Sequence, residues 1–146
     1  MTTYFTNSKN NYLSNYYKVK FKDYFFSNLI FPSVEHYYES MKYFITKSNN
    51  WINHINNIIK IKNPKDVKLY TKAYPYNCHS FCENKNLIMK KGLYLKFSQN
   101  ENLQKKLKKN NNKLIAKIND NYWGIETDRK GKNILGILLE ELRNEL

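Results

Sequence analysis

The chain has 146 residues, enough for a single domain that buries a core without disulfide or metal staples. Hydrophobic residues make up 41% of it and aromatic residues 16%, which excludes an intrinsically disordered chain. The formal net charge of +13 attracts anions such as phosphates, nucleotides and nucleic acids, but does not choose among them. Much of this charge is lysine scattered among Asn, Ile and Tyr, a composition that AT-rich codon content alone produces, so it is weak evidence for a partner.

No feature of the sequence predicts export, membrane insertion or a second domain. Residues 1–10 contain neither an apolar run nor a basic start, and no stretch approaches the length of a membrane span. We therefore expect a cytoplasmic protein with no membrane contact. The lack of repeats and of Gly- or Pro-rich linkers predicts one domain over residues 1–146, and the oligomeric state stays open.

The two cysteines, Cys78 and Cys82, are expected to be free thiols. With the neighbouring histidine they fall short of a tetrahedral metal site, unless His36 or His54 joins them. We therefore predict no metal site, and we expect no cofactor.

The first half of the chain predicts a strand region followed by helices. Residues 16–26 are rich in Tyr, Val and Phe and predict strand, with a turn near residues 22–23. Ser33 is a good N-cap for a helix that continues to about residue 44, and residues 50–60 place Trp51, Ile55, Ile58 and Ile59 at helical spacing. The Asn63-Pro64 pair starts a further helix that runs to about residue 73.

The second half of the chain predicts three more helices and one short strand. Residues 86–97 predict a helix, with Leu87, Ile88, Leu93 and Phe97 as candidate buried positions. Leu103 and Leu107 predict a short amphipathic helix that ends at the following asparagines, and residues 114–118 predict a strand. Asn133 is predicted to cap the last helix, with Leu135, Leu138, Leu139 and Leu142 on its inner face. The elements predict a mostly helical α+β domain with a small sheet near its N-terminal half.

One segment, residues 31–44, combines a carboxylate and an amine on a helix. If Ser33 is the cap, Glu35 lies in the first turn, where the helix dipole favours its ionised form. Lys42 is nearly two turns further on and projects from the same face, with Glu39 between them. Such a stripe can supply a proton-handling group and a nucleophile. The alternative is a solvated stripe of ordinary acidic and basic helix pairs.

A second segment, residues 122–136, is a polar loop that ends at a helix N-terminus. Free amides and the helix dipole make such an end suitable for a phosphate or a developing oxyanion. Trp123 can stack on a flat ring, and Gly136 inside the helix indicates close packing. The alternative is a tight connection between elements that binds no ligand.

Taken together, these two segments resemble the NADAR (YbiA-like) family. The first block reads Pro-Ser-Val-Glu-His-Tyr from Pro32 with Lys42 after it, and the second reads Trp-Gly-Ile from Trp123, followed by Gly-Lys-Asn-Ile-Leu-Gly from Gly131. Further segments also resemble the family, in the right order: residues 13–16, 87–89, 95–100 and 138–143. The resemblance spans nearly the whole chain and implies a YbiA-like α+β fold.

What the resemblance implies is hydrolysis of a bond between ribose C1 and a nitrogen. The substrate is then a small-molecule phosphorylated riboside, such as the riboflavin intermediate 5-amino-6-ribosylaminouracil phosphate, or an ADP-ribosylated guanine. Lys42 resembles the family lysine that attacks the anomeric carbon to form a Schiff base, provided that its surroundings lower its pKa. Glu35 resembles the partner carboxylate that handles protons or stabilises positive charge on the sugar.

Further residues match the ligand-binding positions of the family. The residues that the resemblance assigns to substrate binding are Ser14, Asn15, His36, Trp123, Gly124, Asp128 and Asn133. The family usually has a Glu shortly before the Trp-Gly pair, and this chain has Ala116 there. Asp120 survives a few residues later and is the candidate to replace that carboxylate as a catalytic group.

Two other functions remain open on the sequence. The missing carboxylate at Ala116 favours a non-catalytic module that binds ADP-ribose, NAD or a related nucleotide. The charge of +13 and the interleaved Tyr and Lys favour a basic nucleic-acid-binding protein, whose binding weakens steeply with salt.

Overall fold

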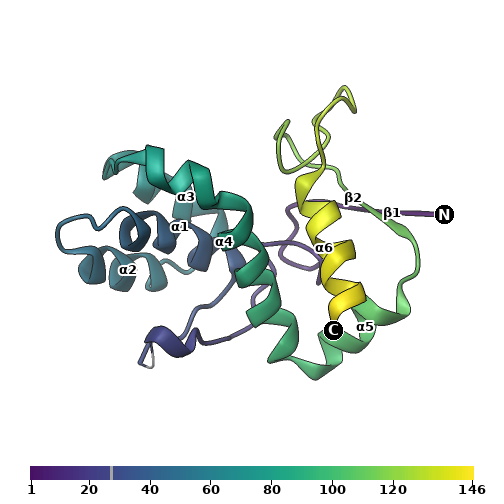
Figure 1. Cartoon of the computed structure of the whole chain (residues 1–146), viewed down its shortest axis with the longest axis horizontal. Coiled ribbons are helices and arrows are strands. Elements are labelled where there is room, and N and C mark those ends of the chain that lie inside the picture. The colour runs from purple at the N-terminus through teal and green to yellow at the C-terminus, as the bar shows by residue number, and fades with distance from the viewer. Residues whose placement is uncertain (27) are drawn as a thin grey trace.

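The computed structural model describes residues 1–26 and 28–146 as an α+β fold dominated by helices. Its elements are β1 (Thr2–Phe5), a 3-10 helix (Tyr24–Phe26), α1 (Val34–Ile45), α2 (Trp51–Ile59), α3 (Pro64–Ala73), α4 (Cys78–Ser98), α5 (Glu101–Lys109), β2 (Lys113–Ala116) and α6 (Ile134–Glu145). Figure 1 shows α1, α2 and α3 gathered on one side of the molecule, and the two strands with α5 and α6 on the other. The long helix α4 runs between these two groups.

The predicted helix starts are confirmed because the capping residues act as their chemistry requires. Ser33 is extended, and its hydroxyl accepts the N–H of His36 at 3.2 Å. Asn63 accepts the N–H of Lys65 at 3.1 Å, ahead of the proline that opens α3. The helix predicted over residues 50–60 is also present, as α2.

Helix α4 begins earlier than predicted. Asn77 accepts the N–H of His79 at 3.2 Å, so the helix starts at Cys78 rather than near residue 86. The predicted burial of Leu87 is wrong, because its side chain is 70% exposed. Successive helical residues are about 100° apart, so the stripe that buries Ile88 and its neighbour Met89 turns Leu87 outwards.

The strand predicted over residues 16–26 is wrong. Its only pairing is an isolated antiparallel bridge between Phe21 and Phe31, and residues 24–26 form the 3-10 helix. That helix is started by Asp23, whose carboxylate accepts the N–H of Phe25 at 3.1 Å. The aromatic residues that favoured a strand pack into the core instead. Phe21 and Phe26 are both buried, and among the described residues neither belongs to a β-strand.

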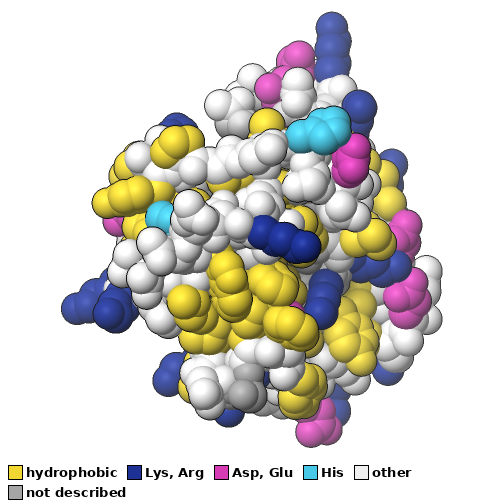
Figure 2. All heavy atoms as spheres, turned by 60° about the vertical axis from the view of Figure 1, so that its left-hand side comes forward, with side chains coloured by type: hydrophobic (Ala, Val, Ile, Leu, Met, Phe, Trp, Pro, Cys, Tyr) yellow, Lys and Arg dark blue, Asp and Glu magenta, His cyan; other side chains and the backbone are white. Residues whose placement is uncertain are grey.

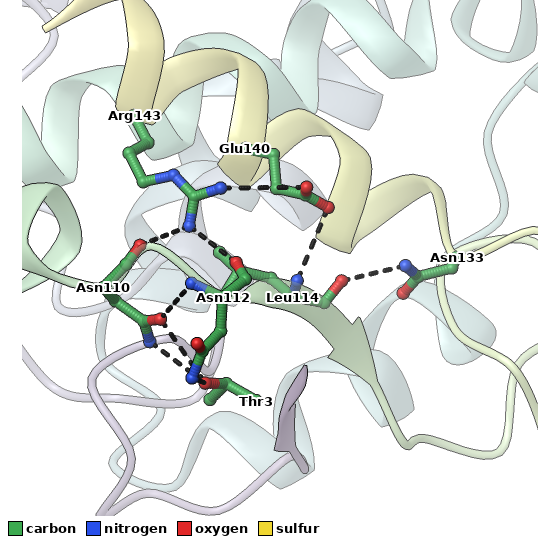
Figure 3. A network of polar contacts seen from close by, with 7 residues as sticks. All are labelled: Thr3, Asn110, Asn112, Leu114, Asn133, Glu140 and Arg143. Atoms are coloured by element: carbon green, nitrogen blue, oxygen red, sulfur yellow. Dashed lines mark hydrogen bonds and ion pairs between the residues drawn. The ribbon is translucent and has the colours of Figure 1, made fainter. Parts of the chain in front are cut away.

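The small sheet joins the start of the chain to residues 113–116. β1 pairs in parallel with β2, with Thr2 opposite Lys113 and Phe5 opposite Ala116. The strand predicted from residue 114 is thus confirmed as β2, whereas β1 was not predicted and the sheet is not confined to the N-terminal half. A polar network ties the sheet to α6, and Figure 3 shows Arg143 reaching the carbonyl of Asn112 at 2.8 Å.

The core lies mainly between α1, α4 and α6. The predicted inner face of α6 is confirmed, since Leu135, Leu138, Leu139 and Leu142 are all buried. An added Cβ on Gly136 would lie 2.1 Å from the carbonyl oxygen of Leu114, so the glycine permits the close approach of α6 to β2. Within residues 1–26 and 28–146, no helix combines the length and hydrophobicity needed to cross a lipid bilayer.

One face of the molecule bears on the nucleic-acid alternative. On the face shown in Figure 2, hydrophobic side chains gather in a patch, whereas Lys and Arg side chains are dispersed around it. A nucleic-acid interface is expected to collect basic side chains into a continuous stripe. This face does not provide one.

Candidate active site

The acidic and basic stripe predicted on α1 exists, and it is buried rather than solvated. Glu35 is 4% exposed and Glu39 is fully buried. Lys42 forms an ion pair with Glu39, with 2.5 Å between Nζ and Oε2. Among the described residues, Glu39 Oε1 has no hydrogen-bond partner. Buried charges are costly unless they are paired or used, so this arrangement argues against an ordinary surface stripe.

A cavity of about 60 Å³ brings the two sequence segments together. It is lined by Asn7, Asn15, Tyr16, Glu35, Tyr38, Lys68, Met89, Ile118, Asn119, Asp120 and Trp123. The carboxyl group of Glu35 on α1 and the indole of Trp123 in the second segment therefore share one cavity. Lys42 does not line it, but its neighbour Tyr38 does, and the ring of Tyr38 packs edge-on against Trp123 with 5.6 Å between centroids.

The fold raises the pKa of the Glu35 carboxyl group into the neutral range. Burial and the nearby charge of Glu39 raise the pKa of Glu35 to about 7. The charges of Lys68 and Lys42 and a hydrogen bond with Tyr16 act in the opposite direction and are outweighed. A carboxyl group with this pKa holds its proton through a large part of the neutral range, which suits a general acid.

Lys42 differs from what its assigned role led us to expect. Burial alone would lower its pKa, but the charge and hydrogen bond of Glu39, together with Tyr76, raise the pKa of Lys42 above its ordinary value. The expectation that its surroundings lower this pKa is therefore wrong. Lys42 rests as an ammonium, and it becomes a nucleophile only by giving a proton to a base such as Glu39, which already touches it.

Asn15 presents an unpaired acceptor to the cavity. Its side chain is 7% exposed, and Oδ1 has no partner among the described residues, while Nδ2 reaches Met89 Sδ at 3.5 Å. The neighbouring Ser14 does not line the cavity, because its fully buried hydroxyl accepts the N–H of Tyr16 at 3.0 Å. Ser14 thus shapes the turn, and Asn15 is the residue of the pair that lines the cavity.

A buried lysine holds this turn in place. Lys96 Nζ donates to the carbonyl oxygens of Tyr12 at 2.7 Å and Ser14 at 2.9 Å. Complete burial lowers the pKa of Lys96 to about 7. The turn that precedes Asn15 is therefore anchored to α4 by two hydrogen bonds.

The second wall of the cavity is a turn organised by Asp120. Its Oδ1 accepts the backbone N–H groups of Tyr122 and Trp123, both at 2.8 Å. Gly124 follows in a space where an added Cβ would lie 2.4 Å from the side chain of Ile118. Asp120 and Trp123 line the cavity, whereas Gly124 acts by allowing the turn to pack closely.

Three of the predicted ligand-binding residues lie elsewhere. Both ring nitrogens of the buried His36 are engaged, with Ser33 Oγ at 2.6 Å and the carbonyl oxygen of Ile61 at 2.7 Å. Asp128 is exposed and accepts the N–H of Lys130 at 3.0 Å. None of the three lines the cavity, and neither do Ser14 and Gly124, so the ligand contacts assigned to these five residues stay predictions.

The third of these residues, Asn133, is structural. It occupies the left-handed region with φ 54°, and its side chain makes no cap hydrogen bond for α6. Instead, its side chain accepts the N–H of Ala116 at 2.8 Å and donates to the carbonyl oxygen of Leu114 at 3.0 Å. These two hydrogen bonds tie Asn133 to the backbone of β2, and Figure 3 shows the second of them. The predicted helix start is confirmed, but the mechanism of capping is not.

Sequence reasoning missed several residues of the cavity. Tyr38 lies three positions after Glu35 on α1, so helical spacing was a signal for it. Tyr16 was assigned to the strand, and Met89 was noted only as part of a family segment. Lys68 belongs to α3, and no local pattern connects it with the other residues of the site.

The predicted thiols are confirmed as free and exposed at Cys78 and Cys82. Among the residues that the structure describes, no group of three or more His, Cys, Asp or Glu side chains is placed to hold a metal ion.

The fold and the comparisons with known proteins define a glycosidase-type hydrolase. The model of the NADAR domain matches residues 4–146, and the chain belongs to this family. The N-glycosidase YbiA of Escherichia coli (strain K12) is 33% identical over 118 residues, which cover 79% of this chain and 70% of that protein. The N-glycosidase YbiA of Shigella boydii serotype 4 (strain Sb227) is 32% identical over 117 residues, with the same coverage.

A solved structure gives the same result. The NMR structure of the Escherichia coli protein YbiA matches with a TM-score of 0.77 and 26% sequence identity, covering 99% of this chain and 83% of that one. The predicted α+β fold and the resemblance to the NADAR family are therefore confirmed.

Proposed function

We propose that this protein hydrolyses the bond between ribose C1 and a nitrogen. The substrate is a small nucleoside-type molecule, either a phosphorylated riboside of the 5-amino-6-ribosylaminouracil phosphate type or an ADP-ribosylated guanine. One observation carries the proposal: the carboxyl group of Glu35, with a pKa raised to about 7, lines the same cavity as Trp123 and Asp120. The glycosidase names of the relatives support the reaction type.

Glu35 is the general acid of the proposed reaction. Cleavage of the C1–N bond leaves an electron pair on the departing nitrogen, and that nitrogen leaves more readily when it is protonated. A carboxyl group with an ordinary pKa is ionised at neutral pH, whereas that of Glu35 is largely protonated up to about pH 7. Once ionised, the same group stabilises the positive charge that develops on the sugar.

Lys42 is the nucleophile of the proposed reaction, activated by Glu39. Because it lies beside Tyr38 and does not line the cavity, its side chain has to move toward the cavity to reach C1. The ammonium passes a proton to the carboxylate at 2.5 Å, and the free amine attacks C1 while the bond to the leaving nitrogen breaks. Glu35 protonates the leaving group and then takes a proton from the new C1–N adduct. Ring opening moves the electron pair of the C1–O bond to oxygen, which takes its proton from Glu39, and leaves a protonated Schiff base on Lys42. Water then adds at C1 and releases the sugar as an aldehyde, with the lysine again an ammonium.

The remaining residues of the cavity bind and orient the substrate. Trp123 and Tyr38 offer aromatic surface to a flat base, and Asn15 offers an acceptor to a sugar hydroxyl. Lys68 lines the cavity but is exposed, which places a cation where a phosphate can reach it. A volume of about 60 Å³ holds only a few water molecules, so sugar binding requires exposed side chains such as Lys68 to move.

The test is a panel of N-ribosides incubated with the protein, followed by mass spectrometry of the released base or amine. Base release is expected from at least one riboside. Glu35→Gln is expected to slow release by a factor of about 100 or more, because it removes the proton donor. The matched control is Glu101→Gln, on the exposed start of α5 and outside the cavity, which is expected to leave the rate unchanged.

The second candidate function is a non-catalytic nucleotide-binding module. It is favoured by Ala116, which is fully buried in β2 where the family usually has a carboxylate. Binding of ADP-ribose by calorimetry without any product from the panel would establish this function in place of the enzyme. Binding to nucleic acid that weakens steeply with salt would instead support the basic-protein alternative.

A further inference from the structure

Three aromatic rings surround the amine of Lys42. The distances from Nζ to the ring centroids are 5.5 Å for Tyr38, 5.4 Å for Tyr76 and 5.8 Å for Phe81. A cation within about 6 Å of a ring centroid is attracted by the electron-rich face. The rings come from α1, from the segment before α4 and from α4 itself, so tertiary packing assembles them. We call these three residues the cation box.

The cation box is built into the core. Tyr38 and Phe81 are 7% and 2% exposed, and their rings meet edge-to-face with 5.2 Å between centroids. Tyr76 packs edge-on against Phe81 at 6.1 Å. The rings therefore hold one another in place without any contribution from Lys42. Tyr38 also lines the cavity, so the box and the cavity share a wall.

The Lys42 nitrogen is positively charged in two states of the proposed reaction, the resting ammonium and the protonated Schiff base, but these two states carry different numbers of hydrogens. The ammonium has three N–H donors for Glu39, whereas the protonated Schiff base has one. A ring face acts on charge and needs no N–H donor, so its attraction survives the change. Hydrolysis requires this protonated form, because water adds far more readily to an iminium than to a neutral imine.

We infer that Tyr38, Tyr76 and Phe81 keep the covalent intermediate on Lys42 protonated, so that water can release the sugar. This inference rests on the proposed function, because it concerns the intermediate that the proposed reaction forms. The rings act through Lys42 and are positioning residues. The other titratable groups that face the amine are Glu39, which touches it, Glu35, one turn further away on α1, and the hydroxyl group of Tyr76, which hydrogen-bonds with the amine and also raises its pKa.

The experiment uses D-ribose 5-phosphate as the aldehyde probe and cyanoborohydride, which reduces the iminium and not the neutral imine. Peptide mass spectrometry measures the adduct on Lys42 across a range of pH. In the wild-type protein the adduct is expected to form until the pH exceeds the pKa of the iminium. In Phe81→Leu and Tyr76→Leu this alkaline limit is expected to fall by about one pH unit, a tenfold change in the protonation equilibrium. Tyr76→Phe keeps the ring but loses the hydroxyl group that hydrogen-bonds with the amine, so its alkaline limit is expected to lie between those of the wild-type protein and Tyr76→Leu.

A second measurement separates the cation box from the proposed function. NMR titration of the Lys42 amine in the free protein, with labelled lysine, needs no substrate. A pKa of Lys42 that is lower in Phe81→Leu than in the wild-type protein, or lower in Tyr76→Leu than in Tyr76→Phe, supports the box, even if no adduct forms and the proposed function fails. A pKa and an alkaline limit that are unchanged in Phe81→Leu and equal in Tyr76→Leu and Tyr76→Phe overturn the inference, even if the wild-type protein forms the adduct. Tyr76 is only partly buried, so its variants keep the test available if Phe81→Leu does not fold.

Discussion

The backbone carbonyl of Asn15 accepts the N–H of Glu35 at 3.1 Å, so the loop that carries the unpaired amide is fixed to the first turn of α1. This bond also satisfies one of the amide groups that a helix N-terminus leaves without an intrahelical partner. The two cavity side chains therefore keep a defined relation to each other. Glu35, Asn15 and the Lys96 that anchors the loop can each be tested by substitution.

The first prediction concerns the pH dependence of activity. Glu35 acts as an acid only while it is protonated, and its pKa is raised to about 7. The rate of base release is therefore expected to fall as the pH rises through about 7, by a factor of ten for each further pH unit. A pH–rate profile at saturating substrate measures this. A rate that stays constant from pH 6 to 9 would contradict the assigned role.

The second prediction concerns stability. Because the pKa of Glu35 is raised in the folded state, its proton favours folding, and this contribution is lost as the pH rises from the unfolded pKa, near 4.5, through about 7. Glu35→Gln is neutral at every pH and avoids this loss. We expect the variant to gain about 1–3 kcal/mol in unfolding free energy over the wild-type protein at pH 8, and no comparable gain at pH 4. Denaturant unfolding at both pH values measures the difference, with Glu101→Gln as the control.

The third prediction is that replacing Asn15 affects stability and substrate binding in opposite directions. Its Oδ1 is buried without a partner among the described residues, which costs free energy in the unliganded protein. Asn15→Leu has a similar volume and removes the unpaired acceptor. The melting temperature is therefore expected to stay the same or rise, while the KM for the active riboside rises about tenfold through the lost hydrogen bond. A variant that loses stability and keeps its KM would show that Asn15 serves the fold alone.

The fourth prediction concerns the anchor of the Asn15 loop. Lys96→Met removes the donor to the carbonyl oxygens of Tyr12 and Ser14, which stay buried without that partner. The expected cost is about 1–3 kcal/mol of unfolding free energy. Lys90→Met on the same helix is the matched control, because Lys90 pairs at the surface with Glu141 and Glu145 and its loss is expected to cost no more than about 1 kcal/mol. Equal unfolding midpoints for the two variants would show that the buried contacts of Lys96 add nothing.

The starts of α1 and α3 were predictable from a local signal, whereas the start of α4 was missed although Asn77 caps it in the same way. Ser33 and Asn63 cap α1 and α3 because a short polar side chain reaches the free amides of its own next turn. Residues 16–26 were not predictable in this way. Their Tyr, Val and Phe side chains favour a strand, but no partner strand lies beside them, and the packing of Phe21 and Phe26 into the core decided their conformation.

The candidate site was predictable in its chemistry and not in its geometry. Helical spacing placed Glu35, Glu39 and Lys42 on one stripe, and the family motif indicated Trp123. Neither the spacing nor the motif could show that the side chain of Asn133 hydrogen-bonds with the backbone of β2, or that Lys68 of α3 lines the cavity. Side-chain partners across long sequence separations have no local pattern.

The sequence by itself determined where α1 and α3 begin, which face of α6 is apolar, and to which family the motifs belong, because these depend on near neighbours along the chain. Only the tertiary structure decided the protonation of the two key groups. Glu35 holds its proton because surrounding elements bury it beside Glu39, and Lys42 stays charged because its contact with Glu39 outweighs its burial. Desolvation and charge–charge interaction depend on distance in space, which the order of residues does not specify.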